Sequence, residues 1–196
     1  MFDFTFCKEP SCHDYVVSGT DTCLFHSKDR EELSADFTHR LEKHETIGSY
    51  SISGLEMRKK DISGSKLYAC NLSHSEFIDV DFSNSYLQLC FLQFSTFIRC
   101  KFKGIVSKYS VFSGSKFIDC DFTESDILHS NFVGIDAKNC IFDDSDLYYT
   151  DFVNAILEDV SFKDCNLKKA DFVASKRVNV SFKFSNFEEA TFSRES

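Results

Sequence analysis

From residue 50 onward, apolar residues recur at every fifth position of the chain. Between Ile52 and Phe192, 26 of the 29 positions in this series are Phe, Leu, Ile or Met. The exceptions are Ser107, Ala137 and Arg177, and no insertion or deletion disturbs the phase. Because an α-helix repeats every 3.6 residues and a strand every 2, this pattern is typical of neither element alone.

A second series, of small residues, lies two positions before each apolar centre. Of the 26 such positions from Ser65 to Ala190, all except Ile105 and Ile135 are no larger than Val. A short extended stretch followed by a turn would direct both residues of each unit inward. Four units would then close a square coil, and the 29 units would stack as about seven coils joined like parallel strands.

Individual units carry a recognisable consensus. Ala-Asp-Phe-Val-Ala at 170–174 and Cys-Asp-Phe-Thr-Glu at 120–124 resemble the small-Asp/Asn-Leu/Phe-x-x consensus of the pentapeptide-repeat family. The resemblance covers about three quarters of the chain. It implies an all-β solenoid, a right-handed quadrilateral parallel β-helix. It also implies that Asp or Asn before the centre, as at Asn131, Asp151 and Asn166, stabilises a turn.

The interruptions of the apolar series have a partial explanation. Ile105 and Ile135 are large where a small residue is expected, and the centres that follow them, Ser107 and Ala137, are small. An exchange of size between the two inward positions would preserve core volume. Arg177 has no such partner in the sequence.

The segment before the repeats contains a possible metal site. Cys7, Cys12, Cys23 and His26 are spaced C-x4-C-x10-C-x2-H, which resembles small zinc-knuckle modules. Three thiolates and one imidazole suit tetrahedral zinc in a closed structural site, which could fold a segment too small for its own core. His13 is an alternative ligand. The other interpretation is three unpaired cysteines and a surface histidine.

A helix is expected between this segment and the repeats. Ser27 has the chemistry of an N-cap, acidic residues follow it, and Leu33, Phe37 and Leu41 form one apolar stripe. The helix would cover about 28–46, stop near Gly48 and cap the first coil. We therefore expect three parts: a zinc-binding segment at 1–27, a capping helix within 28–49 and the β-helix at 50–196.

The other six cysteines all occupy the small inward position. Cys100, Cys120 and Cys140 would stack on successive coils, either as a redox-responsive or metal-responsive thiol row or as ordinary core packing. Packing is favoured, because buried thiols without a nearby cation are inert. An odd total of nine cysteines argues against a disulfide framework.

Composition narrows the class of protein. The net charge of -9 lacks the basic footprint of a nucleic-acid binder, so no direct nucleic-acid binding is expected. No apolar run is long enough for a membrane span, and the amino terminus does not resemble a signal peptide, which favours the cytoplasm. The six histidines form no acid-base constellation and there is no glycine-rich phosphate loop, so we do not expect an enzyme.

One side of the expected rod carries large apolar and acidic residues. In the family geometry, one face presents Tyr86, Leu89, Tyr109, Leu128, Tyr148 and Tyr149, and the adjoining edge presents Asp121, Glu124, Asp126, Asp143, Asp144 and Asp146. Such a surface could bind a protein partner. Alternatively, these are ordinary exposed tyrosines of a β surface and a solvated face.

These features favour a protein-interaction scaffold or regulator whose partner is unknown. The alternative comes from the resemblance: some family members imitate DNA and modulate DNA gyrase or topoisomerase IV, protecting it from quinolones. This chain departs from that type, because it lacks projecting loops and its repeats carry 17 basic against 21 acidic residues. We also expect a homodimer through the carboxy-terminal coils.

Overall fold

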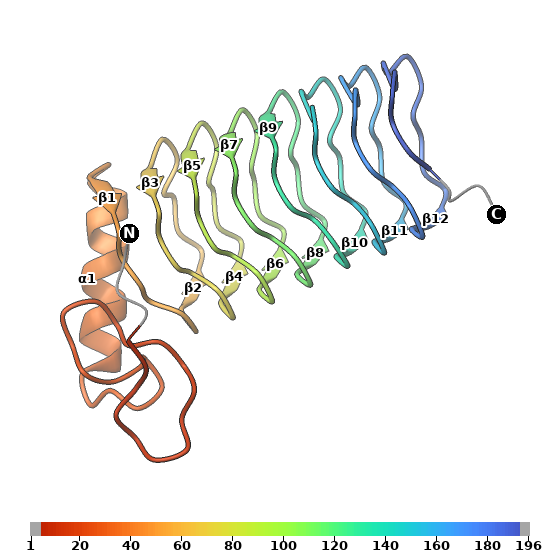
Figure 1. The fold of residues 1–196 in the computed structure, drawn as a ribbon. Coiled ribbons are helices and arrows are strands. Elements are labelled where there is room, and N and C mark those ends of the chain that lie inside the picture. Colours follow the sequence, from red (N-terminus) through yellow and green to blue (C-terminus); the bar gives the residue numbers. More distant parts are fainter. Residues whose placement is uncertain (1–4, 193–196) are drawn as a thin grey trace.

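The computed structural model describes residues 5–192, which form one helix followed by a long parallel β-solenoid (Figure 1). The helix α1 spans Arg30–Glu42, and none of the described helices is long and apolar enough to cross a membrane. The strands are β1 (Thr46–Gly48), β2 (Glu56–Arg58), β3 (Lys66–Tyr68), β4 (Glu76–Ile78), β5 (Tyr86–Gln88), β6 (Thr96–Ile98), β7 (Val106–Lys108), β8 (Lys116–Ile118), β9 (Asp126–Leu128), β10 (Asp136–Lys138), β11 (Ile156–Glu158) and β12 (Lys176–Val178).

The strands form two parallel sheets on different sides of each coil. One sheet has the order β1-β3-β5-β7-β9 and the other β2-β4-β6-β8-β10-β11-β12. Each pairing joins residues 20 apart, as between Phe77 and Phe97, and isolated parallel bridges such as Asp61 with Asp81 keep this offset outside the sheets. The expected coil of four five-residue units, stacked about seven times, is therefore confirmed.

A left-handed residue at every corner produces the period of five. Every fifth residue from Ser49 to Glu189 has a positive φ, between 50° and 77°. The residue before each centre often fixes the same corner: Thr123 donates its N–H to Oδ1 of Asp121 at 2.9 Å. One extended stretch and one left-handed corner thus fill each unit, so the same two side chains always point inward.

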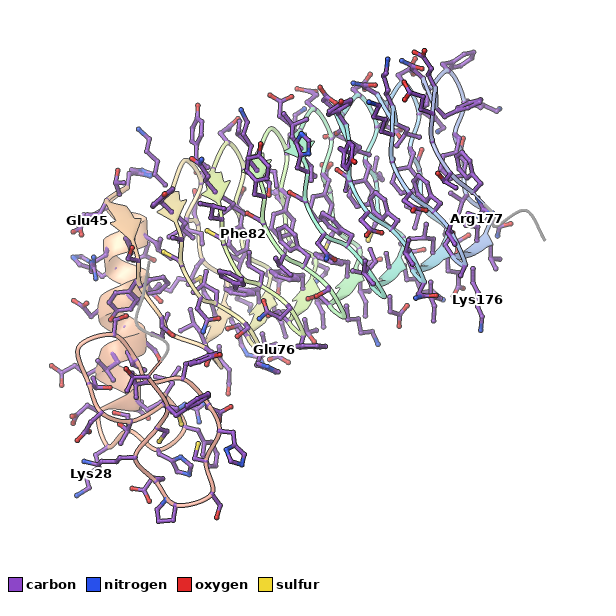
Figure 2. The ribbon with its side chains drawn as sticks, in the orientation of Figure 1. Lys28, Glu45, Glu76, Phe82, Lys176 and Arg177 are labelled. Carbon is purple, nitrogen blue, oxygen red and sulfur yellow. The ribbon has the colours of Figure 1, made fainter. Side chains whose placement is uncertain are left out.

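Phenylalanine rings fill the interior in columns. Phe82 lies inside the coil (Figure 2), and its ring stacks on that of Phe102 with centroids 4.8 Å apart. The column continues through Phe122 and Phe142 at 4.4 and 4.5 Å. Because successive coils are in register, each ring meets an identical ring above and below, which confirms the expected ladder.

The exchange of size between inward positions is confirmed. Ile105, Ser107, Ile135 and Ala137 are all completely buried, so the large and small residues of these units share one interior volume. Arg177 is different: it lies on β12 with its guanidinium 5.2 Å from the ring centroid of Phe192 (Figure 2). The last coils are open enough for this side chain to lie over an aromatic ring instead of within a core.

The helix is shorter than the sequence suggested. It begins at Arg30, after Ser27 Oγ has accepted the Asp29 N–H at 3.2 Å, and it ends at Glu42 instead of near residue 46. His44 has a φ of 55° and donates to the Leu41 carbonyl, and the Glu45 N–H reaches back to the Arg40 carbonyl. These two bonds form a Schellman motif, which ends the helix.

The sequence predicts that the helix stops near Gly48. Gly48 is instead the last residue of β1. That strand pairs with β3 and places Ile47 beside Leu67, so the parallel ladder begins before residue 50. Phe37 and Leu41 of α1 are buried against this first coil, and Glu42 pairs with Lys60 at 2.9 Å. The helix therefore covers the end of the solenoid, as predicted.

Candidate metal centre and outer aromatic surface

Two tight turns near the amino terminus present the four predicted metal ligands. Cys12 closes the first turn by donating its N–H to the Glu9 carbonyl at 3.1 Å. Cys7, which precedes this turn, donates its N–H to the Asp14 carbonyl at 2.9 Å. His26 closes the second turn on the Cys23 carbonyl at 3.2 Å. These bonds fix the backbone around the four ligands, whose ligand atoms come together in one cluster.

The spacing of the ligand atoms fits a tetrahedral metal. Sγ of Cys12 lies 3.8 Å from Sγ of Cys23, and Nδ1 of His26 lies 3.4 Å from Cys23 Sγ and 3.6 Å from Cys7 Sγ. Zinc bonds of ~2.3 Å to sulfur and ~2.0 Å to nitrogen imply tetrahedral edges of ~3.8 Å between sulfurs and ~3.5 Å between sulfur and nitrogen. All four ligand atoms lie within 4.8 Å of one another, so this cluster could bind a metal.

The charges of the thiols also favour a cation at this position. Burial opposes ionisation of Cys7, but hydrogen bonds from the Cys23 backbone and from His26 lower its pKa to about 7. For Cys12, a backbone hydrogen bond at Asp14 favours the thiolate, but burial and the two other thiols raise its pKa to about 11. With a pKa of about 11, Cys12 stays protonated at neutral pH, and a bound metal ion would stabilise its thiolate.

The metal-ligand segment is attached to both the helix and the solenoid. Val17 and Leu24 are buried in the core that the first coils form. The backbone of Ser18 donates to the Ser51 carbonyl at 2.9 Å, and Ser51 donates its N–H to Ser18 Oγ at 2.8 Å. His13, the alternative ligand, is exposed and lies outside the cluster.

Three rings form a continuous column on the outside of the solenoid. Tyr109, His129 and Tyr149 occupy the left-handed corner position of successive coils, with φ values of 56°, 51° and 59°. The His129 ring stacks on Tyr109 at 5.2 Å and on Tyr149 at 5.1 Å. The two tyrosines are 53% and 54% exposed. We call these three residues the aromatic column; Leu89 precedes it at the same corner of the coil before.

The other predicted apolar residues differ in how close they lie to this column. Tyr148 contacts it, because its ring centroid is 5.5 Å from that of His129. Leu128, in β9, precedes His129 directly in the chain. Tyr86, in β5, is at the start of its strand, whereas the aromatic column follows the strands, so Tyr86 is not part of the stack. The sequence interpretation missed His129 although the 20-residue offset from Tyr109 indicates it.

The predicted acidic residues lie before the strand positions or, like Asp126, at the first of them, while the aromatic column follows the strands. Several of their oxygens already have partners: Glu124 pairs with Lys103 at 2.7 Å, and Asp143 Oδ1 accepts the Lys163 N–H at 2.9 Å. Asp121 and Asp146 each accept a backbone N–H two residues later, Asp126 pairs in register with Asp146, and Asp144 has a left-handed φ of 61°. These carboxylates and the column thus lie on opposite edges of one side.

The buried cysteine row behaves as core. Cys100 Sγ donates to the Phe77 carbonyl at 3.3 Å, as Ser95 Oγ donates to the Leu72 carbonyl at the same distance. Hydrogen bonds to the adjacent thiols and burial raise the pKa of Cys120 far above its ordinary value. The hydrogen bond to Cys120 lowers the pKa of Cys100 and Cys140, so the packing interpretation rests on the complete burial of the row and on its bonds to backbone carbonyls.

Comparisons with known proteins agree with the repeat pattern. A pentapeptide-repeat model of eight copies matches residues 65–104, and a pentapeptide repeat region model matches residues 115–192. A comparison with curated proteins found no significant match.

Several solved structures are similar over most of the chain. QnrB1, a plasmid-mediated fluoroquinolone resistance protein, is 20% identical over 71% of this chain and 73% of its own, with a TM-score of 0.29. A pentapeptide repeat protein of the cyanobacterium Cyanothece 51142 is 12% identical over 76% and 98%, with a TM-score of 0.38. HetL of Nostoc is 12% identical over 79% and 94%, with a TM-score of 0.26.

The unbroken five-residue register, the parallel solenoid that it forms and the family models that match most of the repeats lead to one conclusion. The chain belongs to the pentapeptide-repeat family.

Proposed function

We propose that this protein is a non-enzymatic scaffold that binds a protein partner along the aromatic column. The observation that carries this proposal is the position of the rings. Tyr109, His129 and Tyr149 stand at left-handed corners. A residue with a Cβ loses about 1–2 kcal/mol in that conformation, which Gly and Asn adopt more easily. Phe94 is also an exposed ring at such a corner, but only these three rings stack across three successive coils into one surface, which suits a partner.

Other corners of the same solenoid show what the backbone prefers. The equivalent residue is Gly at positions 54, 64, 104, 114 and 134, and Asn at positions 84, 139, 154 and 179. Either residue would form the corner without strain. The remaining corners hold many residue types, so the rings are distinguished by their stacking from coil to coil and not by the corner conformation alone.

Asn substitution tests the proposal, since it relieves the corners while removing the rings. Tagged wild type, the double variant Tyr109→Asn/His129→Asn and the control Phe94→Asn would each capture partners from a lysate of the source organism. Phe94 is matched, because it is 59% exposed at a left-handed corner with a φ of 57°, but on another edge. We expect the double variant to retain less than about one tenth of the captured partner, the loss typical of hot-spot residues. Equal capture by all three would reject the aromatic column.

The same experiment addresses the gyrase alternative. A partner that proves to be a topoisomerase, whose supercoiling activity falls when this protein is added, would support DNA mimicry. Binding would then weaken steeply with salt, because a DNA mimic engages its enzyme through many charges. Binding through aromatic contacts should depend much less on salt.

We further propose that Cys7, Cys12, Cys23 and His26 bind a structural zinc ion. The tetrahedral spacing of their ligand atoms supports the assignment. With four protein ligands the ion has no open position, so its contribution would be to hold the two turns together. We also propose that the apolar carboxy-terminal coils pair two copies of the chain.

A further inference from the structure

A groove lies beside the carboxy-terminal end of the aromatic column. Its volume is about 430 Å³, and it runs across three successive coils. Tyr149 and Asp151 line it on the first coil, Lys169 and Asp171 on the second, and Glu189 and Thr191 on the third. The groove thus combines an exposed aromatic ring with a pair of carboxylates.

The two carboxylates are neighbours because of the register. Asp151 and Asp171 pair as a parallel bridge, which places their backbones about 4.8 Å apart. Each uses Oδ1 to accept a backbone N–H, from Val153 and Val173 respectively, at 2.8 Å. No ion pair between residues 5 and 192 includes either carboxylate, and the lysine in the lining, Lys169, pairs with Glu189 at 3.6 Å.

The fold does not require negative charge at these two positions. Asn131 occupies the same position one coil earlier and accepts the Val133 N–H at 2.9 Å, so an amide forms the same turn. Two adjacent carboxylates repel each other, and burial together with the charge of Asp171 raises the pKa of Asp151. A charged pair that the turn does not need, and that has no cation partner, is suited to a cationic ligand.

The aromatic wall of the groove indicates which cation. Tyr149 stacks on His129 on one side, and the next residue in the column is Lys169, so no further ring continues the stack. A guanidinium group is planar, stacks on aromatic rings and donates several N–H groups in its own plane. An ammonium group offers a point charge and gains less from such a plane.

We propose that this groove binds an arginine side chain of a partner segment, with the guanidinium over Tyr149 and its N–H groups donated to Asp151 and Asp171. The planar fork is wide enough to reach carboxylates on two successive coils. The arginine-bearing partner rests on the proposed scaffold function, but binding of the guanidinium group can be tested without it.

The test uses the full chain, labelled with ¹⁵N, and three short peptides. Acetyl-Gly-Arg-Gly-amide is titrated beside peptides in which citrulline or lysine replaces arginine. We expect the arginine peptide to shift the amide signals around Tyr149–Asp151 and Lys169–Asp171, with affinity at least about tenfold above that of the other two. Equal binding of the citrulline or lysine peptide, or shifts confined to other coils, would overturn the proposal.

A pair of variants controls for the fold. Asp151→Asn/Asp171→Asn keeps an acceptor for both turn bonds, as Asn131 shows, and should abolish the shifts. Asp61→Asn is the matched control, since Asp61 makes the same turn bond to Ser63 at 3.0 Å far from the groove, and it should bind as wild type does. Undiminished shifts in the double variant would rule out the carboxylate pair as the binding site.

This test separates the arginine site from the scaffold proposal. Loss of partner capture in Tyr109→Asn/His129→Asn without any arginine-specific binding would support the aromatic column and reject the arginine site. Arginine binding at the groove, with partner capture unaffected by that variant, would support the site and reject the column.

Discussion

At the scale of single residues, the turn requires only a side-chain acceptor for a backbone N–H. Some positions carry a charge in addition, which the turn does not need. Asn131 and Asp151 make the same turn bond from equivalent positions. The amide does so without charge, whereas the carboxylate is partly buried beside Asp171. The difference between these residues is therefore electrostatic, and it can be measured as a pH dependence of stability.

We expect Asp151→Asn to raise stability at neutral pH. Burial, with the charge of Asp171, raises the pKa of Asp151 in the folded chain. A raised pKa means that the contribution of this group is most favourable below its unfolded pKa of about 3.9 and declines as pH rises through the folded value. The melting temperature of the variant should exceed that of wild type near pH 7, and the difference should disappear near pH 3.

Thermal unfolding followed by circular dichroism across this pH range provides the measurement. Asp61→Asn is the control of opposite sign, because a backbone hydrogen bond from Ser63 lowers the pKa of Asp61. Its carboxylate contributes stability above the unfolded pKa, so this variant should gain nothing at neutral pH. A neutral-pH loss of stability in Asp151→Asn would contradict the expected repulsion.

The packing of a residue could be predicted from the sequence where its partners lie in the same five-residue unit. The exchange between Ile105 and Ser107 is visible because both belong to one unit. The role of Arg177 was not, since its ring partner, Phe192, is three units further along the chain. The groove also escaped prediction, because its lining combines residues from three successive coils.

At the scale of elements, α1 and the metal-ligand segment act together as a cover on the first coil. Phe37 stacks on Tyr50 with ring centroids 5.3 Å apart, and Leu24 enters the same core from the metal-ligand segment. Arg30 at the start of the helix pairs with Glu56 of β2 at 2.7 Å. Because the segment before the helix has few apolar residues of its own, its order depends on what holds its turns together.

We predict one zinc ion per chain, and loss of that ion should lower the melting temperature. Binding to the folded state alone stabilises it, so a chelator should uncover the first coil and shift thermal unfolding downward. Elemental analysis of Cys23→Ser should show almost no zinc, together with the same lower melting temperature. Retention of a full equivalent by this variant would contradict the ligand assignment.

Cys165→Ser is the matched control for that experiment. Cys165 is buried, and its Sγ donates to the Phe142 carbonyl at 3.0 Å, a bond that serine makes at many equivalent positions. This variant should keep its zinc. A wild-type chain purified under reducing conditions without any metal would instead favour the interpretation of three unpaired cysteines.

Helix boundaries were harder to predict than the existence of the helix. The apolar stripe of Phe37 and Leu41 correctly indicated a cap, but Gly48 suggested an end near residue 46, about four residues too late. The chain uses His44 in the left-handed conformation, which carries no glycine signal. Pairing of β1 with β3 then draws residues 46–48 into the solenoid, a tertiary effect that local sequence does not show.

At the scale of the whole molecule, the two ends of the solenoid differ. The amino-terminal coil is covered by α1, whereas the last described coils expose apolar side chains: Phe184 is 84% exposed and Phe187 54%. Phe182 and Phe192 are only partly buried. Exposed phenylalanines on an end that no helix of the described residues covers favour contact with a second apolar surface.

We expect the full chain to be a dimer that depends on this end. Light scattering after size-exclusion chromatography should give twice the chain mass at micromolar concentration, and Phe184→Ser/Phe187→Ser should give the monomer mass. Phe94→Ser removes an equally exposed ring from the middle of the rod and should leave the dimer intact. A monomeric wild type would reject the pairing of copies through these coils.

The continuous register has one more consequence, which concerns how such a molecule can change its length. Because a left-handed corner follows every fifth residue from Ser49 to Glu189, one inserted residue would turn every later inward side chain outward. An added block of 20 residues would keep every column in phase and move the aromatic column away from the metal-ligand segment by about 4.8 Å. The distance between the two sites can therefore change only in steps of one coil, which makes the solenoid a spacer with fixed increments.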